Sequence, residues 1–230
     1  MKHTPYCQAI GSLMYAAIAT HPNITFAVSS LSQFLNNLGD AHWEAVKRIF
    51  HYLISMKDYQ LTYGGKWHEL EGFCDANGGI QEDHIVISGY SFHINGSSIS
   101  WHSKKQELVT LLTTEAEYIA AMHMSKEALW LHKLLCKLFP HLLHLLTTVY
   151  ADNQPTIKLT TSDNYHSHTQ HLDQHYHFIR DVISNGVIKL VYCPTEDMVT
   201  DMLTKALPKW KVGAHTSALG MCHTCRGVAK

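Results

Sequence analysis

The pair Asn95-Gly96 predicts a tight turn near the middle of the chain. It stands between two runs of alternating apolar and polar residues, at positions 85–94 and 98–101. Asparagine and glycine readily adopt the positive φ angles of a tight two-residue turn, so this pattern is a strong signal for a β-hairpin. We therefore predict two antiparallel neighbouring strands in the middle of the chain.

The elements around this hairpin predict an α/β domain. A strand at 72–75 precedes the hairpin, and a long helix at 114–138 follows it. The remaining expected elements are a strand at 146–151, helices from 155 and at 171–184, a strand at 187–192 and a last helix at 196–207. This order favours a mixed five-stranded sheet with helices packed on its faces.

The first 63 residues are expected to form a small helical segment before that domain. Residues 6–37 predict two helices interrupted at His21-Pro22-Asn23, because proline disfavours helix at the residue before it and asparagine caps the helix after it. A third amphipathic helix begins at Asp40, which we expect to be its cap. A chain of this length can hold such a piece beside one domain of about 150 residues.

The composition is typical of a globular protein and gives no direct sign of a nucleic-acid partner. Apolar residues make up 46% and charged residues 16%, and 18 Lys and Arg balance 19 Asp and Glu, so the strong positive field of many nucleic-acid binders is missing. No apolar run reaches the roughly 18 residues of a membrane span. The six dispersed cysteines, without a signal peptide, favour reduced thiols in an intracellular compartment, cytoplasmic or nuclear.

Residue types that often mark binding sites are expected to be structural in this chain. The 19 histidines show neither an HExxH motif nor zinc-finger spacing, so we expect most of them on the surface or in packing. The pair Cys222 and Cys225 lacks a second pair to complete a zinc site. The tryptophans at 43, 101 and 130 lie on patterned elements and are expected in the core rather than stacked on bases.

Four acidic residues are placed where a metal site could form: Asp75 on the first strand, Glu117 at the start of the long helix, Asp152 at the end of the fourth strand and Asp201 in the last helix. Clustered carboxylates resist ionisation side by side, and Mg2+ or Mn2+ normally neutralises them. Two such ions about 4 Å apart can activate a water for phosphodiester hydrolysis. The four residues are far apart in the sequence, so the site requires that the fold bring them together.

Each of these carboxylates also has a purely structural interpretation. Thr114-x-x-Glu117 is a capping box, in which the glutamate binds the free amides of its own helix. Asp152 could simply end a strand. Asp201 could be a solvated helix residue, and Asp197, one turn earlier, competes with it for the fourth position.

Seven segments carry a pattern of known order and spacing: Phe73-Cys74-Asp75-Ala76-Asn77, Ser88-Gly89-Tyr90, Trp101-His102-Ser103-Lys104-Lys105-Gln106, Thr113-Thr114-Glu115-Ala116-Glu117-Tyr118, Ala151-Asp152-Asn153-Gln154, His175-Tyr176-His177-Phe178-Ile179-Arg180 and Asp201-Met202-Leu203-Thr204-Lys205. Over about residues 68–211 this pattern resembles the ribonuclease H domain that ends copia-type LTR retrotransposon polyproteins. Upstream, residues 11–15, 41–43 and 47–48 resemble the segment that joins that domain to the reverse transcriptase.

The resemblance implies a fold, a reaction and a set of domains. The fold would be a ribonuclease H-like mixed sheet over residues 64–211, after a helical remnant of the reverse transcriptase and connection at 1–63 and before a C-terminal tail at 212–230. The reaction would be hydrolysis of the RNA strand of an RNA/DNA hybrid, with two Mg2+ or Mn2+ ions held by Asp75, Glu117, Asp152 and Asp201. The polymerase motifs are absent, so no polymerase activity is expected.

The resemblance also implies partners. RNA/DNA hybrid is the expected substrate, distinguished through its 2′-hydroxyls, and the missing reverse transcriptase portion is a further expected partner. Lys104, Lys105, Asn153 and Gln154 adjoin the expected site and are candidates for backbone and sugar contacts.

The chain also departs from the family pattern. His168, Gln170 and His175 occupy places where relatives commonly carry Arg or Lys, and lost cations weaken phosphate binding. The alternative function is therefore a catalytically silent remnant, or a nucleic-acid-binding module, that keeps the ribonuclease H fold.

Overall fold

The computed structural model describes residues 4–64, 69–77, 86–106, 113–140, 146–161 and 173–224. Its first part is a unit of three helices, α1 (Tyr6–Ala19), α2 (Thr25–Ser32) and α3 (Asp40–Ser55). A short 3-10 turn at Pro22–Ile24 separates α1 from α2, which confirms the interruption expected at the proline. Ile10, Leu13, Val28 and Val46 are buried together at the centre of this unit. Amphipathic helices that are too short to be stable alone thus share one core.

The start of α3 corrects one detail of the prediction. Gly39 is the N-cap, and Asp40 is the first helical residue. The backbone N–H of Gly39 donates to His42 Nδ1 at 3.1 Å, so an imidazole three residues on satisfies the N-cap amide. Asp40 still carries a favourable negative charge in the first turn.

Five strands of the described residues form one mixed sheet, in the spatial order β4-β3-β2-β5-β6. Its strands are β2 (Glu71–Ala76), β3 (Ile87–Ile94), β4 (Ser97–Lys105), β5 (Thr147–Ala151) and β6 (Ile188–Tyr192). β2, β3 and β4 are antiparallel neighbours, whereas β5 is parallel to β2 and β6 is parallel to β5. The turn between β3 and β4 has φ of 52° at Asn95 and 79° at Gly96. The α/β fold with a mixed five-stranded sheet and the central hairpin are both confirmed.

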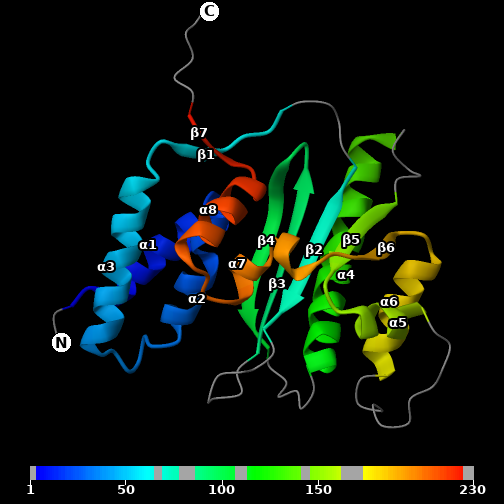
Figure 1. Ribbon diagram of the computed structural model, residues 1–230, viewed down its shortest axis with the longest axis horizontal. Coiled ribbons are helices and arrows are strands. Elements are labelled where there is room, and N and C mark those ends of the chain that lie inside the picture. Colours follow the sequence, from blue (N-terminus) through cyan, green and yellow to red (C-terminus); the bar gives the residue numbers. More distant parts are fainter. Residues whose placement is uncertain are drawn as a thin grey trace, which may run out of the picture.

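Helices cover both faces of this sheet (Figure 1). α4 (Thr113–Leu138), α5 (Gln154–Thr161) and α6 (Asp173–Ser184) follow the strands, and α7 (Asp201–Thr204) and α8 (Lys209–Ala218) come last. Cys74 of β2 is buried against residues of α4 and α6, including Tyr118 and Ile179. Asp75, the next residue, faces the opposite side, where Thr204 of α7 contacts it. Alternation along β2 therefore places Cys74 against α4 and α6, and Asp75 on the side of α7, where Phe73 also packs.

The expected last helix at 196–207 is wrong. The structure has a 3-10 turn at Thr195–Asp197 and a single helical turn in α7, and Lys209 then begins α8. Pro208, which was expected to end a helix, is the N-cap of α8. Proline is tolerated at a helix start because the first amides there need no intrahelical acceptor.

Residues 209–224 are folded onto the rest of the described chain, although 212–230 were expected to be a tail; residues 225–230 lie outside the described part. β7 (Met221–His223) pairs antiparallel with β1 (Tyr59–Leu61), and Leu219 and Met221 are buried. The backbone N–H of Ser98, at the β3–β4 hairpin, donates to Leu219 O at 3.0 Å. α8 and the β1–β7 pair thus link the helical unit to the five-stranded sheet.

Gly220→Ala is expected to loosen this link. Gly220 has φ of +88°, and an added Cβ would lie 2.5 Å from Ser97 Cα. Strain and backbone overlap of this kind cost about 1–3 kcal/mol. We expect a lower free energy of unfolding in urea. Gly213→Ala, in the middle of α8, is the control and should be neutral or stabilising, because no atom of the described residues lies within 4 Å of its added Cβ. Equal stability of the Gly220→Ala variant and wild type would contradict this prediction.

Two further expectations concern apolar surface. Among the described helices, none is both long and apolar enough to cross a bilayer.

Trp43 packs on the core of the helical unit, and Trp101 Nε1 donates to Ala17 O at 2.8 Å. Trp130, in contrast, is 57% exposed, so its expected core position is wrong. It lies on α4 beside the buried Leu131, on the side of the helix that turns away from the core.

Candidate active site

Parallel pairing of β2 with β5 brings two aspartates to one end of the sheet. Cys74 pairs with Ala151, so Asp75 and Asp152, the residues that follow, are neighbours there. Glu117 reaches the same point from the beginning of α4. One ligand oxygen from each of these three carboxylates lies within 4.8 Å of the other two. The fold therefore gathers three of the four carboxylates singled out in the sequence.

Glu117 is directed at this cluster rather than at the end of its own helix. Its Oε2 accepts a hydrogen bond from Ala76 N on β2 at 3.2 Å. Thr114, the expected N-cap of a capping box, is already inside α4, which begins at Thr113. The capping box is therefore not formed, and β2 fixes the side chain of Glu117 beside Asp75.

The electrostatics of the cluster oppose ionisation when no cation is bound. Burial, and after it the nearby charges of Asp75 and Asp152, raises the pKa of Glu117 to about 9, although the Ala76 amide and Lys205 act in the opposite direction. The pKa of Asp75 is raised to about 6, mainly by burial, even though Lys205 and Thr204 act in the opposite direction. Carboxylates held together in a poorly solvated place are stabilised as anions by a nearby positive charge.

Two residues that the sequence analysis did not single out contact Asp75. The hydroxyl of Thr204 donates to Asp75 Oδ2, and Lys205 Nζ lies 3.7 Å from the same oxygen. Both residues belong to the segment 201–205, one of those that resemble the family. That resemblance was the signal in the sequence that could have pointed to Thr204 and Lys205. Their individual contacts depend on the seating of α7 and are not visible in the sequence.

Asp201 adjoins the cluster without joining the three converging carboxylates. It is 1% exposed, and its Oδ1 forms an ion pair with Lys205 Nζ at 2.6 Å. Lys205 thus bridges Asp201 and Asp75. Asp197, the competing candidate, is exposed to solvent. Of these two aspartates, Asp201 is the one connected to the site.

The donor set fits a hard divalent cation. Three carboxylates offer only oxygen ligands, and Mg2+ and Mn2+ prefer such ligands. Asp75 is 1% exposed and Glu117 9%, whereas Asp152 is more accessible, so the cluster opens to solvent on the Asp152 side. Asp152 Oδ2 also accepts a hydrogen bond from Thr195 Oγ1 at 3.1 Å, which orients it.

The two candidate lysines are at the same end of the sheet as the carboxylates. Ala76 pairs with Ser88, and Ser88 pairs with Lys104, so the end of β4 is aligned with the end of β2. Lys104 and Lys105 are both exposed there. One strand, β3, separates these two lysines from Asp75 on β2.

Asn153 and Gln154 occupy the start of α5. Asn153 Oδ1 accepts from Thr156 N at 2.9 Å, so this side chain caps the helix and its oxygen already has a partner. Gln154, the first residue of α5, is exposed beside Asp152. His168, Gln170, Cys225 and the side chain of His175 lie outside the described part of the chain.

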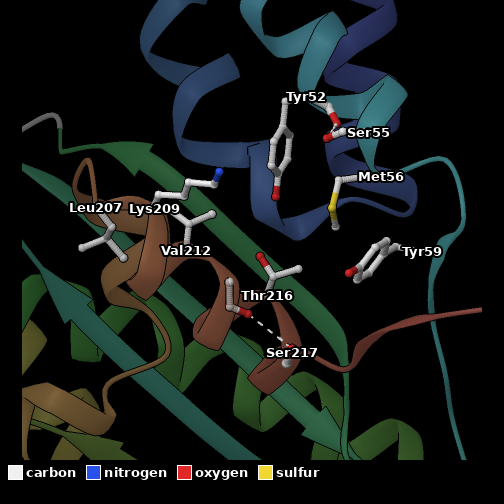
Figure 2. Close-up of a pocket in the computed structure, with 10 residues that line it drawn as sticks. Tyr52, Ser55, Met56, Tyr59, Leu207, Lys209, Val212, Thr216 and Ser217 are labelled. Atoms are coloured by element: carbon white, nitrogen blue, oxygen red, sulfur yellow. Dashed lines mark hydrogen bonds between the residues drawn. The ribbon is translucent and has the colours of Figure 1, made fainter.

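A cleft of about 640 Å3 lies elsewhere, between the end of α3, β1 and α8. Figure 2 shows Tyr52, Met56 and Tyr59 on one side of it and Val212 and Thr216 of α8 on the other. None of the carboxylates or lysines discussed above lines this cleft. It is therefore separate from the candidate active site.

The chain is similar in sequence to transposon polyproteins, although no protein-family model matches it. It is 41% identical over 222 residues to the retrovirus-related Pol polyprotein from transposon TNT 1-94 of Nicotiana tabacum, covering 96% of this chain and 17% of that protein. It is 33% identical over 232 residues to the Pol polyprotein from transposon RE2 of Arabidopsis thaliana, covering 99% and 16%. The chain thus spans about a sixth of the length of these relatives.

Other similarities are shorter or more distant. Secreted RxLR effector protein 161 of Plasmopara viticola is 41% identical over 133 residues, which cover 57% of this chain and 94% of that protein. Among solved structures, LC11-RNase H1 in complex with RNA/DNA hybrid aligns with a TM-score of 0.44 at 14% identity, over 59% of this chain and 93% of that one. The foamy viral protease-reverse transcriptase in complex with dsDNA aligns with a TM-score of 0.48 at 14% identity, over 83% and 38%.

Proposed function

Because the chain belongs to the copia-type retrotransposon Pol polyproteins, we propose that it is their ribonuclease H, a nuclease that hydrolyses the RNA strand of RNA/DNA hybrids. The observation that carries this proposal is the convergence of Asp75, Glu117 and Asp152 at the end of a mixed sheet. Three carboxylates alone are compatible with several classes of metal-dependent hydrolase. Family membership reduces this range of possible reactions.

In this proposal the three carboxylates, with Asp201 beside them, hold two Mg2+ or Mn2+ ions. Such ions supply an activated water at neutral pH and stabilise the charge that develops on the phosphate. The Ala76 amide holds Glu117 in place, and Thr195 holds Asp152. Lys205 keeps Asp201 next to Asp75. The protein thus contributes fixed ligands that need little reorganisation when substrate arrives.

The test is cleavage by the purified 230-residue chain. End-labelled RNA/DNA hybrid, RNA duplex and DNA duplex are incubated in Mg2+ and in EDTA. We expect cutting of the RNA strand of the hybrid only, in Mg2+ only. Binding of hybrid without any cutting would instead support the silent binding module, and preferential cutting of DNA duplex would point to a DNA endonuclease.

Lys104 and Lys105 are proposed to contact the phosphate backbone of the hybrid. The double variant Lys104→Ala/Lys105→Ala is expected to bind hybrid more weakly at low salt. The logarithm of the association constant falls linearly with the logarithm of the salt concentration. Each lost phosphate contact should make this slope less steep by roughly 0.7–0.9. Titrations of fluorescent hybrid at several salt concentrations measure both quantities. The control is Lys189→Ala, an exposed lysine on β6, the opposite edge strand. An unchanged salt slope in the double variant would exclude these contacts.

A further inference from the structure

The single turn of α7 is seated unusually close to the sheet beside Asp75. Gly89 pairs with Asp75 across β2 and β3. A Cβ at Gly89 would lie 2.8 Å from Thr204 Cγ2 and 2.9 Å from Leu203 Cβ, so any side chain there would displace α7. Because Gly89 has no side chain, Thr204 can reach the carboxylate of Asp75, the cross-strand neighbour of Gly89.

Thr204 makes its shortest contact with that carboxylate. Both residues are almost fully buried, with exposures of 0% and 1%, and the Thr204 hydroxyl donates to Asp75 Oδ2. Its contacts with Thr200 O and Asp201 O are long, at 3.4 Å each. A hydroxyl that served only its own helical turn would favour those carbonyls. The bond to Asp75 is thus the main interaction of this side chain.

A neighbouring buried threonine, Thr200, offers a comparison for Thr204. Thr200 is equally buried, and its Oγ1 has no hydrogen-bond partner among the described residues. The segment around α7 therefore contains two buried threonines of the same shape, of which one contacts the carboxylate cluster. A threonine required only for packing would resemble Thr200.

We propose that Thr204 is a positioning residue: its hydroxyl fixes the orientation of Asp75 for a divalent cation, with Gly89 providing the close approach of α7. The inference rests on the proposed function, because it assigns Asp75 to cation binding. Side chains that hydrogen-bond to a metal-coordinating residue and orient it typically contribute 10- to 100-fold to metal affinity. A charge-assisted hydrogen bond to a buried carboxylate belongs to this class.

The test compares three variants of the full chain: Thr204→Val, Thr204→Ser and Thr200→Val. Mn2+ affinity is measured by calorimetry, and thermal unfolding is recorded with and without Mn2+. We expect Thr204→Val to bind Mn2+ roughly 10- to 100-fold more weakly. Thr204→Ser, which keeps the hydroxyl, should recover most of the affinity. Thr200→Val, the same substitution in the same segment, should bind like wild type and unfold at a similar or higher temperature.

The outcomes separate this inference from the proposed function. Wild-type affinity in Thr204→Val, or an equal loss in Thr200→Val, would overturn the role of Thr204. Mn2+ binding by wild type without cleavage of hybrid would overturn the proposed function while the comparison of variants still decides the role of Thr204. Absence of Mn2+ binding by the folded wild-type chain would overturn both.

Discussion

Asp152→Asn is expected to reduce Mg2+-dependent cleavage of RNA/DNA hybrid by at least about 100-fold, with no change in fold. Asparagine keeps the size of the side chain and an oxygen that can accept from Thr195, but it removes one negative charge from a cluster of three carboxylates. Charge stabilisation by a bound divalent cation amounts to several kcal/mol, and each 1.4 kcal/mol corresponds to a factor of ten in rate. Single-turnover cleavage rates at saturating enzyme measure the loss.

The control for this variant is Asp197→Asn. Asp197 is an exposed carboxylate only a few residues from Thr195, and it is outside the converging trio. Cleavage by this variant should be within about twofold of wild type, since exposed charges contribute little. Circular dichroism confirms folding of both variants. Equal cleavage by Asp152→Asn and wild type would remove the three-carboxylate site from the mechanism.

Glu117→Gln is expected to stabilise the cation-free protein above neutral pH while abolishing cleavage. The pKa of Glu117 is raised from its ordinary 4.5 to about 9, with burial as the main cause. Below pH 4.5 the carboxyl is protonated in both the folded and the unfolded chain, so it does not affect stability. As pH rises from 4.5 to 9, only the unfolded chain ionises, and stability is progressively lost. Glutamine does not ionise and still offers Ala76 N–H an acceptor, so it avoids this loss.

The gain in stability of Glu117→Gln depends on how far the pKa of Glu117 is raised in the folded protein. One pKa unit corresponds to about 1.4 kcal/mol, so at pH 8 a gain of about 2 kcal/mol in the free energy of unfolding is a conservative expectation. For a chain of this size that is a rise in Tm of roughly 4–8 °C. At pH 4 the two proteins should unfold at similar temperatures. Added Mg2+ should raise the Tm of wild type and leave that of Glu117→Gln nearly unchanged.

Thermal unfolding in EDTA at pH 4, 6 and 8, followed by the same series in Mg2+, tests these statements together. Glu115→Gln is the control, because Glu115 is on the same helical turn and is outside the carboxylate cluster. A Glu117→Gln variant that is less stable than wild type at pH 8 without cation would show that the ionised carboxylate is favourable there. The burial argument would then be wrong.

Local signals predicted most elements of this fold correctly. The Asn95-Gly96 turn, the proline between α1 and α2, and the apolar spacing of α3 and α4 each depend on residues close in sequence, which is why they were readable. The prediction was wrong at Pro208, where the same residue can end one helix or begin the next. It also missed the pairing of β1 with β7, because strands of three residues carry little local signal and are formed by a partner far away in the chain.

Residue types and their order along the chain restrict which side chains can form a site, since carboxylates after two strands and at the start of a long helix are visible as a pattern. Which of these carboxylates meet depends on how the strands and helices pack. Parallel pairing of β2 and β5 placed Asp75 beside Asp152, and the close seating of α7 on Gly89 gave Asp75 its contact with Thr204. Whether Glu117 caps its helix or faces the cluster was likewise a question of one hydrogen bond, to Ala76 of β2. Such choices depend on distances between segments that are remote in the chain, and those distances are fixed only when the sheet and its helices pack together.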